Sequence, residues 1–105
     1  MKEISPKELQ ALKESGENFE LIDVREKSEY ELANLSGKLI PMGEIPERHH
    51  EISKDKKVVV MCRSGKRSAN IAQYLETVQG YKDVYNLEGG ILAYSHDVDP
   101  SIPKY

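Results

Sequence analysis

The one cysteine of this chain, Cys62, lies in a short segment that is rich in positive charge. Arg63, Lys66 and Arg67 follow it within the next five positions. A cysteine is a nucleophile only as the thiolate, and a free thiol has a pKa of about 8.5. A lone cysteine at a strand end is more often an inert buried residue, but clustered cations are costly unless an anion lies beside them. We therefore predict that Cys62 is a nucleophile with a lowered pKa.

Two regular elements are expected to position this segment. Residues 58–61 are continuously apolar and mostly β-branched, which is typical of a strand buried on both faces. Residues 69–78 carry an apolar stripe that ends at Val78, which predicts an amphipathic helix. Gly65 permits a sharp turn between the two elements, so that consecutive N–H groups can point at one anion. The N-terminus of the helix adds its dipole and its unpaired N–H groups.

The rest of the chain alternates between strand and helix patterns, which predicts an α/β fold with a parallel sheet and helices on both of its faces. Ser5, Pro6 and Glu8 form the start signal of a helix that we expect to end at Gly16. Further expected strands cover residues 19–24, 38–42 and 84–87, and further helices cover residues 26–34, 46–52 and 91–97.

Ligands of open α/β sheets bind beyond the carboxyl ends of the strands. Three segments of the chain are expected there, at residues 23–25, 62–68 and 88–90. The reactive cysteine is in the middle one, so this edge of the sheet is the expected site.

Length and composition exclude several classes of protein. A chain of 105 residues predicts a single domain over residues 1–105. A net charge of -3 argues against nucleic-acid binding, and no apolar run approaches a membrane span or a secretory signal, so a cytoplasmic location is expected. One cysteine excludes an intrachain disulfide and a cysteine-cluster zinc site. The neighbouring His49 and His50 point about 100° apart on a helix, and no metal site is expected.

Phosphate is one candidate anion for the loop, because cysteine phosphatases hold it with a Cys-x5-Arg loop. Here Arg67 arrives one position early, and no histidine precedes Cys62. A shorter loop encloses a smaller space, which suits an additional sulfur atom better than a tetrahedral oxyanion. A phosphatase is therefore the weaker interpretation.

Three motifs together resemble the rhodanese-like sulfurtransferase family. Residues 62–68 resemble its six-residue active-site loop, residues 21–26 its aspartate-arginine motif, and residues 86–91 its C-terminal signature. Residues 30–46 and 98–105 are similar to the rhodanese domain that is fused to sulfur-carrier adenylyltransferases. The order and spacing of the motifs match from about residue 4 to the end, and the resemblance implies a central parallel sheet of about five short strands.

The resemblance also implies a two-step transfer of sulfur. Cys62 would take the outer sulfur of a small anionic donor such as thiosulfate and hold it as a persulfide. It would then pass the sulfur to cyanide in an assay, or to a thiol or a protein sulfur carrier in the cell. No metal or organic cofactor is implied. The loop residues are expected to bind the substrate: Arg63, Ser64, Gly65, Lys66, Arg67 and Ser68.

Other residues are expected to support the loop rather than to react. Asp23 and Arg25 are assigned an ion pair at the edge of the sheet, and Gly89 and Gly90 a tight turn that lets backbone approach. Arg67 either faces the donor or pairs with an acid such as Asp23 and braces the loop, and bracing is the favoured option. Arg63 and Lys66 are expected to attract the donor at the rim.

Three other functions for Cys62 stay open at this point. One is a small phosphatase or an arsenate-type reductase, although a single cysteine leaves no resolving thiol in the chain. Another is a non-catalytic rhodanese-like binding module, and the third is a redox sensor that forms a sulfenic acid.

Overall fold

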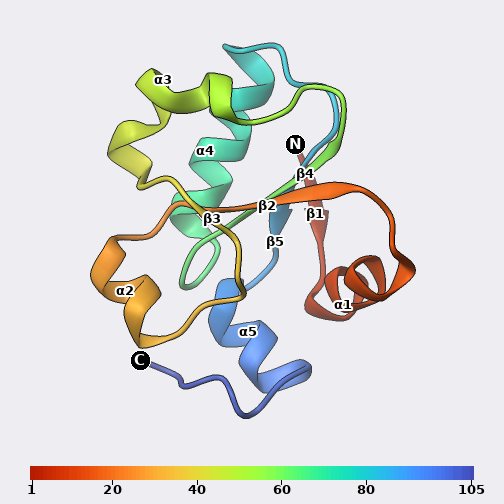
Figure 1. Cartoon of the computed structure of the whole chain (residues 1–105), viewed down its shortest axis with the longest axis vertical. Helices are drawn as coiled ribbons and strands as arrows, with labels where there is room; N and C mark the ends of the chain where they lie inside the picture. The colour runs from red at the N-terminus through yellow and green to blue at the C-terminus, as the bar shows by residue number, and fades with distance from the viewer.

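A computed structural model describes all 105 residues and shows a five-stranded parallel sheet with helices around it (Figure 1). The strands are β1 (Lys2–Ile4), β2 (Phe19–Asp23), β3 (Lys38–Leu39), β4 (Lys57–Met61) and β5 (Val84–Leu87). They lie in the order β1-β5-β4-β2-β3, and every neighbouring pair is parallel. The predicted α/β class with a parallel sheet of about five strands is confirmed.

Helices cover both faces of the sheet, and each face has its own apolar core. The helices are α1 (Pro6–Ser15), α2 (Lys27–Leu32), α3 (Ile45–Arg48), α4 (Lys66–Thr77) and α5 (Gly90–Asp97), with 3-10 turns η1 (Met42–Glu44) and η2 (His49–Glu51). Residues of α3 and α4 join one core with Val58 and Val60, and residues of α1 and α5 join the other with Val59 and Met61. Because β4 alternates between the two cores, its uninterrupted apolar run is explained.

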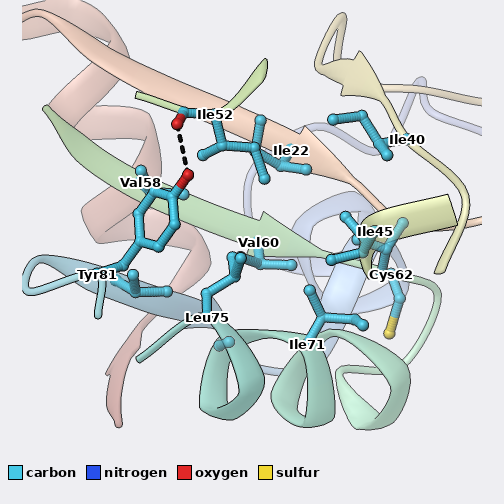
Figure 2. Close-up of a cluster of buried hydrophobic side chains, with 13 residues drawn as sticks. Ile22, Ile40, Ile45, Ile52, Val58, Val60, Cys62, Ile71, Leu75 and Tyr81 are labelled. Carbon is cyan, nitrogen blue, oxygen red and sulfur yellow. Dashed lines mark hydrogen bonds between the residues drawn. The ribbon is translucent and has the colours of Figure 1, made fainter. Parts of the chain in front are cut away.

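Cys62 lies at the edge of the first core. Figure 2 shows its sulfur beside Ile71, next to the N-terminal turn of α4. At the other end of the same core, the buried Tyr81 hydroxyl donates a hydrogen bond of 2.6 Å to the carbonyl oxygen of Ile52. The apolar side chains therefore hold the strand and the helix on either side of the cysteine in fixed positions.

Several helix and strand boundaries agree with the predictions from the sequence, and several differ. Helix α1 begins with the predicted capping box at Ser5 and ends at Gly16, which has φ 77°. Helix α4 begins at Lys66, three residues earlier than expected, because Gly65 already caps the N-terminus of the helix. Its predicted stripe is wrong at one position, since Val78 lies beyond the helix and is 64% exposed.

Four other segments also differ from the predictions. Strand β1 was not expected, because three residues carry no readable alternation and gain their order by pairing with β5. Helix α2 ends at Leu32 rather than residue 34, since Ala33 is extended. Strand β3 stops after two residues, because Met42 starts a 3-10 turn after Pro41. Helix α3 begins at Ile45, one residue before the expected Pro46. No helix combines the length and the apolar character that crossing a membrane requires.

Candidate functional site

The loop after β4 curves around the sulfur of Cys62. Gly65 has φ 99°, a backbone conformation that favours glycine, and its N–H donates to Sγ at 3.1 Å. The Ser68 hydroxyl lies 3.3 Å from the same atom. The loop therefore turns its donors inward, onto the sulfur, at the N-terminus of α4.

These donors determine the ionisation of the thiol. Burial alone raises the pKa of Cys62, but hydrogen bonds from the Ser68 hydroxyl and from the backbone N–H groups of Ser68, Gly65 and Ser64 outweigh it. The net pKa therefore lies below the ordinary value, in the direction favourable to a thiolate. The charged groups of the predicted site contribute less than this ring of uncharged donors.

The sulfur is closed off from solvent in this conformation. Cys62 is 0% exposed, and neither of the two surface hollows, of about 580 and 380 Å³, is lined by a residue of the loop. A donor therefore reaches Sγ only after side chains over the loop have moved. The loop side chains best placed to move are exposed ones, which include Arg63, Ser64 and Lys66.

A pair of glycines backs the loop from the side of β5 and α5. A Cβ atom on Gly90 would lie 2.3 Å from the carbonyl oxygen of Arg63. The N–H groups of Ile91 and Leu92, in the first turn of α5, donate to the carbonyl oxygens of Cys62 at 2.9 Å and Arg63 at 3.2 Å. The backbone at Gly89 and Gly90 therefore lies close against the loop.

Asn86 also supports the loop, and the sequence reasoning did not single it out. Its Nδ2 donates to the carbonyl oxygen of Gly65 at 3.2 Å, and its Oδ1 accepts from the Ser68 hydroxyl. Asn86 is 3% exposed. A polar residue in the middle of a short buried strand is a signal that could have identified it, because buried amides need partners.

Asp23 and Arg25 form a fully buried ion pair below the loop. Two hydrogen bonds of 2.9 and 2.8 Å join the guanidinium of Arg25 to the two carboxylate oxygens of Asp23, and both side chains are 0% exposed. Burial opposes the charge on Arg25, but hydrogen bonds to Asp23 and Tyr105 outweigh it and raise its pKa. The pair braces the end of β2 and makes no hydrogen bond to Cys62.

Arg67 braces the loop, but its partner differs from the acid suggested by the sequence. Its guanidinium donates two hydrogen bonds, of 2.8 and 2.9 Å, to the carboxylate of Glu29 on α2. Asp23 is not available because Arg25 already occupies both of its oxygens. The hydrogen bonds from Arg67 lower the pKa of Glu29 to about 2.

Tyr105 joins these two ion pairs, and it too was missed. Its hydroxyl donates to Glu29 at 2.8 Å and accepts from Arg25 at 2.8 Å. The guanidinium carbons of Arg25 and Arg63 lie 5.6 and 5.1 Å from the centre of its ring. Its carbonyl oxygen accepts from Nε of Arg63 at 2.6 Å. No local pattern indicates this role, because 38 residues or more separate Tyr105 from the loop cations.

The three loop cations therefore differ in what they contact. Arg67 is bound to Glu29 and Arg63 to Tyr105, whereas Lys66 is exposed and makes no ion pair or hydrogen bond through its side chain. Lys66 is the cation of the loop that remains available to an incoming anion. No group of three metal-ligating side chains gathers anywhere in the structure.

This fold and this loop define a known class of protein. The chain belongs to the rhodanese-like domain family, whose pattern matches residues 5–97. It is 43% identical over 101 residues to the putative sulfurtransferase YtwF of Bacillus subtilis, and the match covers 95% of this chain and 96% of that protein.

Longer proteins carry a similar segment. The chain is 45% identical over 91 residues to the rhodanese-like/PpiC domain-containing protein 12 of Arabidopsis thaliana, covering 82% of this chain but 30% of that protein. It is 32% identical over 105 residues to the probable adenylyltransferase/sulfurtransferase MoeZ of Mycobacterium tuberculosis, covering 97% of this chain and 26% of that one.

Solved structures show the same fold. A rhodanese-like domain protein of Staphylococcus aureus superposes with a TM-score of 0.83 at 30% identity, covering 100% of this chain and 99% of that one.

Proposed function

We propose that this protein is a sulfurtransferase that carries a sulfane sulfur as a persulfide on Cys62, within a single domain formed by residues 1–105. The observation that carries the proposal is the ring of donors around Sγ. Backbone N–H groups that already stabilise a thiolate also stabilise a negatively charged sulfur one bond further out, because they need no reorganisation.

The transfer proceeds in two displacements. The thiolate of Cys62 attacks the outer sulfur of thiosulfate, the sulfur–sulfur bond of the donor breaks, and sulfite leaves with the electron pair. Cys62 then carries a second, negatively charged sulfur. Cyanide or another thiophilic acceptor attacks this outer sulfur, the new sulfur–sulfur bond breaks, and the thiolate is restored.

The loop residues divide this work between them. Ser64, Gly65 and Ser68 provide the donors to the sulfur, and Lys66 attracts the anionic donor because no acid neutralises it. Arg63 joins Lys66 at the rim when it leaves the carbonyl oxygen of Tyr105. Arg67 positions the start of α4 through Glu29.

A phosphatase is less well supported by the same geometry. A phosphate site needs a guanidinium pointing into the loop, whereas both terminal nitrogens of the Arg67 guanidinium are bound to Glu29. A structure from Rhodopseudomonas palustris titled a possible tyrosine phosphatase shares the fold at 24% identity, which bears on the fold alone. A purely non-catalytic module would have no use for inward-turned donors around a cysteine.

The acceptor that we propose is a thiol or a protein sulfur carrier. Two relatives support this class, since one is named a putative sulfur carrier protein and another an adenylyltransferase/sulfurtransferase. The exposed rim formed by Arg63, Ser64 and Lys66 provides the face on which such a carrier would dock.

The deciding experiment compares two reactions of the same purified protein. We expect thiocyanate to form from thiosulfate and cyanide, no phosphate to be released from an aryl phosphate, and Cys62→Ser to abolish thiocyanate formation. Asn70→Ala, an exposed change on α4, is the matched control and should leave the rate unchanged. Phosphate release without thiocyanate formation would overturn the proposal.

A further inference from the structure

The Ser68 hydroxyl has one hydrogen and two neighbours that can accept it. Its Oγ lies 2.5 Å from Oδ1 of Asn86 and 3.3 Å from Sγ of Cys62. Both Ser68 and Asn86 are buried, at 0% and 3% exposed, so water does not supply a substitute donor. The position of this one hydrogen therefore determines which of the two neighbours is satisfied.

The orientation of the Asn86 amide is determined by its other contacts. Its Nδ2 donates to the carbonyl oxygen of Gly65 and to a carboxylate oxygen of Glu3, each at 3.2 Å. Both partners only accept hydrogen bonds, so a flipped amide would place its oxygen against two oxygens. Oδ1 therefore faces Ser68, and because Oδ1 has no hydrogen, Ser68 must be the donor.

This arrangement matches the protonated form of Cys62. Because the Ser68 hydroxyl donates its one hydrogen to Asn86, it cannot also donate to the sulfur. In the contact between Ser68 Oγ and Cys62 Sγ, the S–H group of Cys62 is then the donor, and a free lone pair of Oγ accepts. A chain of two hydrogen bonds then runs from sulfur to hydroxyl to amide. When the side chains over the loop move and the thiol loses its proton to solvent, the sulfur has nothing to donate, and the hydroxyl gains more by turning to the anion.

We propose that Asn86 is a positioning residue that holds the Ser68 hydroxyl while Cys62 is a thiol and releases it to the sulfur when the proton has left. Loading a second sulfur onto Cys62 also removes the thiol proton, so the same release accompanies the persulfide of the proposed function. Asn86 thereby opposes ionisation of the empty enzyme, and the backbone N–H groups of the loop favour it.

Among the charged side chains around the thiol, only Glu3 makes a hydrogen bond to a member of this sulfur–hydroxyl–amide series, at Nδ2 of Asn86. Arg63 lies in the loop, and Lys66 and Arg67 lie on α4, with Glu29 of α2 paired to Arg67. Glu3 lies on β1 beside Asn86. Asp23, at the end of β2, and Arg25, just after it, neutralise each other. None of them makes a hydrogen bond to Sγ or to Ser68 Oγ. A change at Asn86 is therefore transmitted to the sulfur through Ser68.

The test measures the thiol pKa by the absorbance of the thiolate in the unloaded protein, with four variants. Asn86→Leu removes the competing acceptor, so the pKa should fall by about half to one unit. Ser68→Ala should raise the pKa, and adding Asn86→Leu to Ser68→Ala should change nothing further. Asn70→Leu, an exposed change of the same type on α4, should leave the pKa at the wild-type value.

The double variant separates the proposal from a mere distortion of the loop. If Asn86→Leu shifts the pKa equally with and without the Ser68 hydroxyl, Asn86 acts through Gly65 and the proposal is wrong. A second measurement needs no substitution: the side-chain carbonyl carbon of Asn86 in the wild-type protein should shift in an NMR titration with the midpoint of the thiol. A flat Asn86 signal across that midpoint contradicts the proposal, whether or not sulfur transfer is observed.

Discussion

The loop around Cys62 is held from two sides by contacts of different kinds. On the side of β5 and α5 the supports are uncharged: Asn86 binds Gly65, and the backbone at Gly90 lies directly against Arg63. On the side of β2 and α2 the supports are charges, from the buried Asp23–Arg25 pair to the Arg67–Glu29 pair at the rim. Figure 1 shows the loop between α2 and α5, where the two kinds of support meet.

The difference indicates a division of labour. The uncharged side determines the shape of the loop, because backbone contacts at van der Waals distance tolerate no added atom. The charged side helps to determine which cations remain available, because Glu29 binds Arg67, whereas Lys66 has no partner. Substitutions on the uncharged side should therefore abolish sulfur transfer, and substitutions on the charged side should alter stability or donor affinity.

The largest effect is expected on the uncharged side, for Gly90→Ala. The added Cβ would lie 2.3 Å from the Arg63 carbonyl oxygen at a residue with φ 63°. We expect a loss of about 4 kcal/mol in the free energy of unfolding and at least a hundredfold fall in kcat/KM. Gly80→Ala is the matched control, since it has φ 74° but meets no atom within 4 Å, and it should cost about 1 kcal/mol. Equal losses in the two variants would mean that close approach to the loop is unimportant.

The second-largest effect is expected for the buried Asp23–Arg25 pair of the charged side. Asp23→Asn leaves the fully buried Arg25 without a counter-charge, and removal of one partner of a buried pair costs about 3 kcal/mol. Urea unfolding measures this loss. Glu44→Gln breaks a pair with Arg48 whose Glu44 side chain is 52% exposed, and should cost less than about 1 kcal/mol. A small loss for Asp23→Asn would show that the buried pair is not a structural support.

A smaller, pH-dependent effect is expected at the rim, for Glu29→Gln. The folded pKa of Glu29 is about 2, below its ordinary value of 4.5, so its ion pair stabilises the fold above about pH 4.5 and is lost as pH falls toward 2. The variant should lose about 1 kcal/mol at pH 7 and nothing below pH 2. Thermal unfolding across this range measures the difference between the two proteins. A difference independent of pH would rule out the pair as its source.

The smallest effect is expected for Lys66→Ala, which removes the unpaired cation without touching a support. We expect KM for thiosulfate to rise about fivefold, with kcat and stability nearly unchanged. Lys7→Ala, an exposed lysine on α1, is the control and should leave KM as it is. A fall in kcat alone would place Lys66 in the chemical step rather than in donor attraction.

On both sides of the loop, the sequence allowed prediction of local supports better than of long-range ones. The loop with Gly65 and the helix after it are consecutive residues, so local patterns identify them. The Asp23–Arg25 pair is also local, since only Val24 separates the two residues. Contacts between residues this close in the sequence can be predicted from residue type and spacing alone.

The missed supports are long-range contacts. Glu29 reaches Arg67 across 38 positions, and Tyr105 reaches Glu29 across 76. Asn86 reaches Ser68 across 18. No periodicity records such pairs, because packing of the sheet and helices brings them together. The closed state of Cys62 was not predicted either, since burial of a loop residue depends on side chains from several elements.

The most direct test of the account is the mass of the intact protein after incubation with thiosulfate. A persulfide on Cys62 predicts an increase of about 32 Da that a thiol reductant removes and that Cys62→Ser never shows. An unchanged mass in the wild-type protein, or an equal increase in the Cys62→Ser variant, would contradict the assignment of Cys62 as the sulfur carrier.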